Sequence, residues 1–143
     1  MRELIVILTL ASTLLAACAT SPEAYYAAQP RCGTRPPDPV VAQRCLAVPQ
    51  ARDYLGRAQK QVLDAWHVPG DVSANESIDL TFRLRLDGSI QCLSLSSNPN
   101  KALAQSVVSA LQRVTPFPPV PSEAACLGKL PVIATFSNPP EKP

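Results

Sequence analysis

The residues from 77 to 86 alternate strictly between polar and apolar side chains. The polar positions are Ser77, Asp79, Thr81, Arg83 and Arg85, and the apolar ones are Ile78, Leu80, Phe82, Leu84 and Leu86. Since successive side chains of a β-strand point to opposite faces, this pattern predicts a strand with one buried and one solvated face. Such a strand is typical of an antiparallel sheet that is covered on one side only, which restricts the fold to a few layered architectures.

An Asp-Gly pair at 87–88 follows this strand and predicts a turn into a second strand over 89–96. If the loop has two residues, Leu84 faces Gln91, and Cys92 lies on the solvated face beside Arg83. A β-bulge or a longer loop would turn Cys92 inward. The sequence leaves both arrangements open.

Two helices and a last strand complete the compact part of the chain. Apolar residues recur at steps of three and four over 51–66 and 103–114, which predicts two amphipathic helices. The proline-rich run 115–121 must be extended, and a short strand is expected over 130–136. The apolar positions of the first helix are Leu55, Ala58, Val62, Ala65 and Trp66. We therefore expect an α+β domain over 51–137, a three-stranded antiparallel sheet with two helices packed on one face, in the order α-β-β-α-β.

The chain contains 16 prolines, and they mark the expected domain boundaries. Pro, Ala, Gln and Arg mix without periodicity up to residue 50, so we interpret 18–50 as a proline-rich tether. The same run is also consistent with a ligand for a proline-binding groove. Residues 138–143 are expected to form a disordered tail.

The N-terminus carries the features of an export signal. Arg2 precedes an apolar stretch over 4–17, which is too short for a spanning helix and fits a secretory signal. The stretch ends in Leu-Ala-Ala-Cys at 15–18, which resembles the lipobox of bacterial lipoproteins. The resemblance implies that 1–17 is a signal peptide, that Cys18 is lipidated, and that Ala19 directs the protein to the outer membrane. The alternative is an ordinary signal peptide with a chance cysteine.

Export would place Cys32, Cys45, Cys92 and Cys126 in an oxidising compartment, where four cysteines are expected to form two disulfides. Three pairings are possible. We favour Cys32 with Cys45 and Cys92 with Cys126, since each pair then lies within one part of the chain. A metal site is not expected, because the paired ligand spacings of zinc sites are missing from the sequence.

Composition argues against several functional classes. With 13 basic and 11 acidic residues the net charge is +2, which is too weak to indicate nucleic acid binding. The only histidine, His67, has no identifiable base or nucleophile as a partner, and five glycines form no phosphate-binding loop. We expect no enzyme activity, no cofactor and no small-molecule substrate. Trp66 is interpreted as a packing residue, and Phe117 as the residue that pins the proline-rich run to the sheet.

Several short motifs occur together in the compact part. They are Val62-Leu63-Asp64-Ala65-Trp66 with Pro69, Arg85-Leu86-Asp87-Gly88-Ser89, Leu95-Ser96-Ser97-Asn98-Pro99-Asn100, and Ser106-Val107-Val108-Ser109-Ala110-Leu111 leading into Pro116-Phe117-Pro118-Pro119-Val120-Pro121. In this order and spacing they resemble the periplasmic C-terminal domain shared by TonB and TolA, and the TolA type more closely. The resemblance covers about 54–136. The chain differs in having Ala104 where the family often has an aspartate.

The resemblance implies a non-catalytic docking module that binds envelope proteins, often by strand addition to an unpaired sheet edge. The expected edge is the last strand, and the candidate partner-binding residues are Leu130, Pro131, Val132, Ile133, Ala134, Thr135, Phe136, Arg83 and Arg85. The expected partner is a Tol component, a transporter or a secretion component. Since the inner-membrane helix and long spacer of TonB and TolA are missing from the sequence, energy transduction is not implied.

We thus expect a lipoprotein on the periplasmic face of the outer membrane that binds another envelope protein. A first alternative is a structural accessory subunit of a Tol-type or secretion assembly, held by side-chain interfaces. A second is a small periplasmic hydrolase or an enzyme inhibitor.

Overall fold

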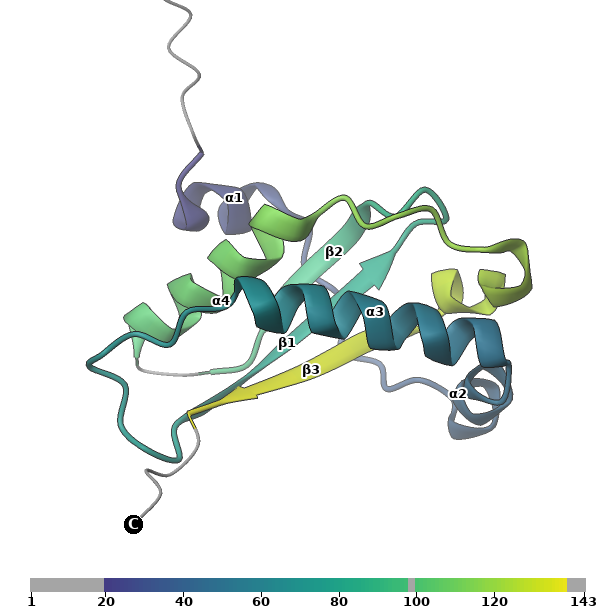
Figure 1. Cartoon of the computed structure of the whole chain (residues 1–143), viewed down its shortest axis with the longest axis horizontal. Helices are drawn as coiled ribbons and strands as arrows, with labels where there is room; N and C mark the ends of the chain where they lie inside the picture. Colours follow the sequence, from purple (N-terminus) through teal and green to yellow (C-terminus); the bar gives the residue numbers. More distant parts are fainter. Residues whose placement is uncertain (1–19, 98–99, 139–143) are drawn as a thin grey trace, which may run out of the picture.

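The computed structural model describes residues 20–97 and 100–138. The expected signal peptide, Cys18 and the last five residues lie outside this part of the chain. The elements are α1 (Pro22–Ala28), α2 (Pro39–Leu46), α3 (Pro49–Ala65), β1 (Ser77–Leu84), β2 (Ile90–Leu95), α4 (Lys101–Val114), the 3-10 helix η1 (Ser122–Lys129) and β3 (Pro131–Ser137). Figure 1 shows α3 and α4 on one face of a three-stranded sheet.

The sheet has the strand order β2-β1-β3, and both neighbours run antiparallel to β1. The alternation in β1 has the predicted effect, because Ile78, Leu80, Phe82 and Leu84 are buried. Leu86 was expected to extend this row, but it lies beyond the end of β1 and is 53% exposed. The predicted α+β fold with three antiparallel strands is confirmed.

The hairpin contains a bulge that explains its register. Arg83 pairs with Cys92, so Cys92 lies on the face of the sheet opposite the helices. Leu84 then pairs with Ile90 and not with Gln91, because the register shifts between Arg83 and Leu84. The bulge therefore lies on the turn side of Cys92 and does not turn this residue inward.

The two long helices cover the apolar face of the sheet. The Asn100 side chain caps α4 by accepting a hydrogen bond from the Leu103 N–H at 3.1 Å. In α3 the buried residues are Ala51, Tyr54, Ala58 and Val62, whereas Leu55 is only half-buried. Trp66 packs edge-on against Phe136, with ring centroids 5.1 Å apart, and its indole N–H donates to the Ser106 hydroxyl. The packing role predicted for Trp66 is confirmed.

The proline-rich run after α4 is extended, as predicted, and lies against the β1–β2 turn. The Phe117 N–H donates to the Gly88 carbonyl at 3.0 Å, and the Val120 N–H donates to the Leu86 carbonyl at 2.9 Å. Phe117 is buried and stacks on Phe82, with centroids 6.2 Å apart. Phe117 therefore pins the run to the sheet. The short helix η1, which the sequence analysis did not predict, connects this run to β3.

The structure differs from the tether expected before residue 51. From residue 20 onward this region forms α1 and α2, and it is tied to the domain by disulfides between Cys32 and Cys92 and between Cys45 and Cys126. The pairing that we favoured was wrong. Each bond joins the N-terminal region to the α+β domain, and folding thus brings together cysteines that are 60 and 81 residues apart.

Candidate functional site

The two edges of the sheet differ, and this difference defines the candidate site. The outer edge of β2 is closed by the chain's own N-terminal region. The Leu93 N–H donates to the Pro30 carbonyl at 2.8 Å, and the Leu95 N–H donates to the Tyr26 hydroxyl at 3.2 Å. The Arg31 guanidinium donates to the Leu93 carbonyl at 3.2 Å. These bonds occupy backbone groups that an edge strand would otherwise offer to a partner.

The outer edge of β3 is the open one. The Asp79 carbonyl faces β2, where it accepts a hydrogen bond from the Ser96 N–H at 2.9 Å. Because backbone groups alternate in direction along a strand, β3 residues such as Ala134 bond to β1, and Ile133 and Thr135 direct their N–H and C=O groups outward. Within residues 20–97 and 100–138, no loop or turn segment forms a backbone hydrogen bond to these outward groups.

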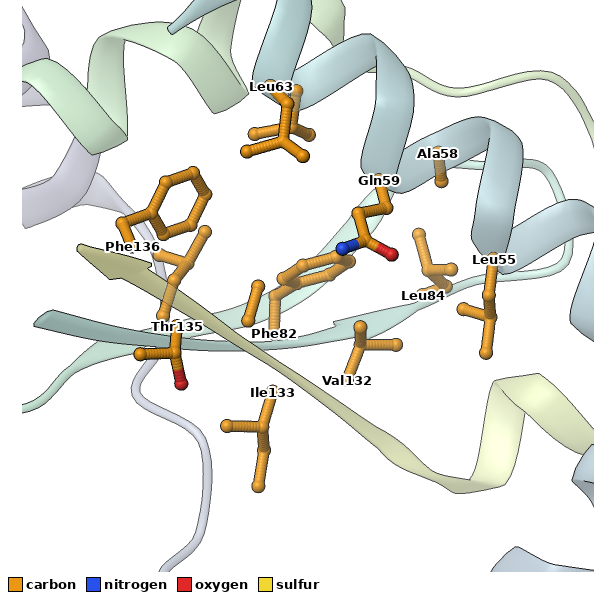
Figure 2. Close-up of a pocket in the computed structure, with 13 residues that line it drawn as sticks. Leu55, Ala58, Gln59, Leu63, Phe82, Leu84, Val132, Ile133, Thr135 and Phe136 are labelled. Carbon is orange, nitrogen blue, oxygen red and sulfur yellow. The ribbon is translucent and has the colours of Figure 1, made fainter. Parts of the chain in front are cut away.

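A groove between α3 and β3 runs alongside this open edge, with a volume of about 420 Å³. Figure 2 shows Leu55, Gln59 and Leu63 of α3 on one side of it, and residues of β3 on the other. The residues that border it are Leu55, Ala58, Gln59, Val62, Leu63, Leu80, Phe82, Leu84, Val132, Ile133, Ala134, Thr135 and Phe136, although the side chains of Ile133 and Thr135 point away from α3. None of these residues carries a charge, so the groove is suited to apolar side chains.

The seven candidate residues of the last strand have different positions. Leu130 is buried and precedes β3, and Pro131 opens the strand without an N–H to offer. Val132, Ala134 and Phe136 pair with the buried residues of β1 and so lie on the helix-covered face. Ile133 and Thr135 lie on the opposite face, and Ile133 is 59% exposed.

The two candidate arginines lie in different places. Arg83 is half-buried on the face opposite the helices, where it pairs with Pro131 of β3. Arg85 lies beyond β1 and donates from its guanidinium to the Ile90 carbonyl at 2.7 Å. Arg83 therefore lies on the central strand, one strand away from the open edge, and Arg85 stabilises the hairpin turn.

The structure brings no catalytic constellation together at His67. This residue is exposed at the end of α3, where its Nδ1 lies 3.1 Å from the Ala65 carbonyl oxygen and 3.3 Å from the Arg113 guanidinium. In the part of the chain that the structure describes, no group of three or more His, Cys, Asp or Glu residues is arranged to hold a metal ion. Of the described helices, none has the length and apolar character needed to span a bilayer.

The pKa values of two side chains are shifted, and each shift has a cause in the structure. The hydroxyl of Ser89 donates to the Asp87 carboxylate at 2.6 Å, and this hydrogen bond lowers the pKa of Asp87 at the hairpin turn. Burial raises the pKa of Tyr54, whose hydroxyl donates to the Pro118 carbonyl at 2.7 Å. These groups stabilise the turn and the proline-rich run.

Helix, hairpin, helix and edge strand thus follow one another between Ala51 and Phe136. A comparison with known protein families matches residues 51–136 to the family described as TonB C terminal. The chain belongs to the TonB C-terminal family. Comparisons with curated proteins and with solved structures found no match. TonB C-terminal domains are generally non-catalytic modules that interact with other envelope proteins, which agrees with an open edge beside an uncharged groove.

Sequence reasoning missed part of the site. Leu63 is 45% exposed and lines the groove, although it lies off the apolar positions that predicted α3. A single leucine beside such a row is not a specific signal, because single exposed apolar residues are common on protein surfaces. The closure of the β2 edge by Pro30 has no sequence signal of its own, because it depends on where α1 packs.

Proposed function

We propose that this TonB C-terminal domain binds an extended segment of another envelope protein by adding it as a fourth strand beside β3. The observation that carries the proposal is the difference between the two sheet edges. The β2 edge already donates hydrogen bonds to Pro30 and Tyr26 and accepts one from Arg31. The β3 edge directs the backbone groups of Ile133 and Thr135 outward.

The groove beside β3 supports the same proposal. Main-chain pairing supplies affinity in strand addition, and pockets for alternate side chains supply specificity. A strand beside β3 would point every second side chain toward α3, where Leu55 and Leu63 line an uncharged groove. The open edge and the groove therefore form one continuous surface.

We further propose that the protein is a lipoprotein anchored through Cys18 to the periplasmic face of the outer membrane. Cys18 precedes Thr20 by two residues, a span of at most about 7 Å. The Thr20 carbonyl accepts a hydrogen bond from the Gln112 side chain of α4 at 2.9 Å. Figure 1 shows α1 beside α4 and β2, with β3 at the opposite edge of the sheet. An anchor at Cys18 would therefore leave the β3 edge available to a partner.

Strand addition is tested by replacing Ile133 with two different residues. Ile133→Pro removes the outward N–H without removing a bond to β1, whereas Ile133→Thr keeps this N–H and changes only the side chain. Each variant is crosslinked in intact envelopes, and captured proteins are identified by mass spectrometry. We expect a partner that is captured by the original chain and by Ile133→Thr but lost with Ile133→Pro. Circular dichroism checks that the proline variant is folded, and unchanged capture by a folded proline variant contradicts strand addition.

Exposed apolar residues of α2 favour a second candidate function, that of an accessory subunit held by side-chain contacts. Val40, Val41 and Leu46 are 53%, 44% and 44% exposed, respectively. Exposed apolar surface is typical of protein interfaces where it forms a patch. Under this alternative Ile133→Pro leaves capture intact, whereas Val40→Asp together with Val41→Asp abolishes it.

A further inference from the structure

We propose that residues 32–37 form a second wall of the partner site, and that Arg35 in this wall selects a partner strand with acidic side chains. We call these residues the crossing segment. The inference rests on the proposed strand addition to β3, and it adds the chemistry of the partner. The crossing segment lies outside residues 51–136, which match the TonB C-terminal family.

The crossing segment is fixed to the sheet. The disulfide between Cys32 and Cys92 joins it to β2, and the Cys32 N–H donates to the Ser94 hydroxyl at 2.9 Å. Cys92 faces away from the helices, so the crossing segment starts on the face opposite α3 and α4. In Figure 1 the chain between α1 and α2 passes behind the sheet.

A hollow lies between the crossing segment and this face of the sheet, with a volume of about 390 Å³. Arg35, Pro36 and Pro37 line it on one side, and Pro131 and Ile133 of β3 line it on the other. Ile133 also borders the groove beneath α3, although its side chain points away from α3. The open edge of β3 therefore lies between two hollows, and a strand added there has one for each set of alternate side chains.

The two hollows differ in charge. The groove beneath α3 has no charged lining residue, whereas the hollow behind the sheet has the exposed Arg35 in its wall and Arg83 nearby on the same face. Within residues 20–97 and 100–138, Arg35 forms no hydrogen bond or ion pair. Asp79 also lines this hollow, and its carboxylate accepts a hydrogen bond from the Thr135 hydroxyl at 2.6 Å, so a negative charge lies beside Thr135 and the positive charge of Arg35 lies in the crossing segment.

These charges define the partner by chemistry. Side chains that point toward α3 should be apolar, and side chains that point toward Arg35 should be acidic, because a carboxylate there gains an ion pair. The expected partner is an extended segment in which apolar and acidic residues alternate. A segment with lysine at the positions that point toward Arg35 would place two positive charges together, and we expect it to bind more weakly.

The test uses the full chain and two synthetic eight-residue peptides, one alternating valine with glutamate and one alternating valine with lysine. Binding is measured by isothermal titration calorimetry. We expect the glutamate peptide to bind more tightly, and Arg35→Glu to weaken it by about fivefold, the upper range for an exposed ion pair. Arg44→Glu is the matched control, since Arg44 is exposed on α2. This substitution makes the same change of charge outside the hollow. This control should leave the preference unchanged.

The outcomes separate the two proposals. If Ile133→Pro abolishes binding of both peptides while Arg35→Glu leaves their ratio unchanged, strand addition stands and the selective wall is overturned. If neither peptide binds, or if Ile133→Pro has no effect, strand addition itself fails and this inference falls with it.

Discussion

Gly88 combines two backbone requirements at one residue. Its φ is +88°, and a Cβ atom there would lie 2.0 Å from the carbonyl oxygen of Phe117. Any other residue must therefore adopt a disfavoured conformation and also push the proline-rich run away from the hairpin. We expect Gly88→Ala to lower the free energy of unfolding by about 2 kcal/mol or more, measured by urea titration. Gly70→Ala is the control, since no atom lies within 4 Å of its added Cβ. Equal urea midpoints for the two variants would contradict this account.

Tyr54 makes the free energy of unfolding depend on pH in the alkaline range. Burial raises its pKa above the ordinary value of 10.0, and the neutral hydroxyl donates to the Pro118 carbonyl. With a higher pKa in the folded state, the stabilisation is complete below pH 10 and is lost as pH rises through the folded pKa. We expect the free energy of unfolding to fall less between pH 9 and pH 11 in Tyr54→Phe than in the original chain. At pH 7 the variant should be less stable by about 1 kcal/mol. An identical alkaline loss in both proteins would exclude Tyr54 as the cause.

At the scale of elements, the two disulfides join α1 and α2 to the rest of the domain. The bond between Cys45 and Cys126 connects α2 to η1 and closes a loop of 81 residues. A loop of this length corresponds to about 4 kcal/mol of stabilisation through the restricted unfolded chain. We therefore expect the double variant Cys45→Ser and Cys126→Ser to lose stability of this order in urea titration. Mass spectrometry of non-reduced peptides provides the check on the pairing. A peptide that links Cys32 to Cys45 would contradict the structure.

The elements that sequence could predict are those with a long local pattern. β1 alternates over its whole length, and α3 and α4 each carry apolar residues at helical spacing. The local sequence therefore indicates which face of each element is buried. The helices α1 and α2 have only 7 and 8 residues, too few for such a pattern. Their start signals were present, however. Ser21 and Asp38 cap them, and each cap is followed by a proline at the first helical position. We interpreted these prolines as a tether, because the contacts that stabilise both helices come from distant residues.

In the candidate site, too, local patterns could be predicted from the sequence and contacts between distant segments could not. The period of β3 indicated which side chains face the helices, and the resemblance to TonB and TolA domains suggested this edge. The closure of the other edge depends on a bond between Pro30 and Leu93, and the groove depends on how α3 crosses β3. Both follow from packing between segments far apart in the chain. A local sequence pattern contains no information on such pairs.

At the scale of the whole molecule, the proposed lipid anchor Cys18 precedes Thr20, the first described residue, by two positions. Each CH₂ group of an acyl chain that enters the bilayer contributes about 0.8 kcal/mol, so several chains on Cys18 would hold the protein firmly. We expect Cys18→Ala to move the protein from the membrane fraction to the soluble periplasmic fraction, measured by immunoblot after cell fractionation. Ala19→Ser is the control, since it changes the neighbouring residue and leaves the Cys18 thiol in place.

The anchor and the binding surface should be separable in this experiment. Thr20 is bonded to α4, on the side of the sheet away from β3, so the loss of the lipid should not alter the open edge. The purified Cys18→Ala protein should therefore bind the valine-glutamate peptide as the lipidated protein does in detergent. Cys18→Ala protein that remains with the membranes after a high-salt wash would contradict the anchor, because salt removes proteins held only by surface charge.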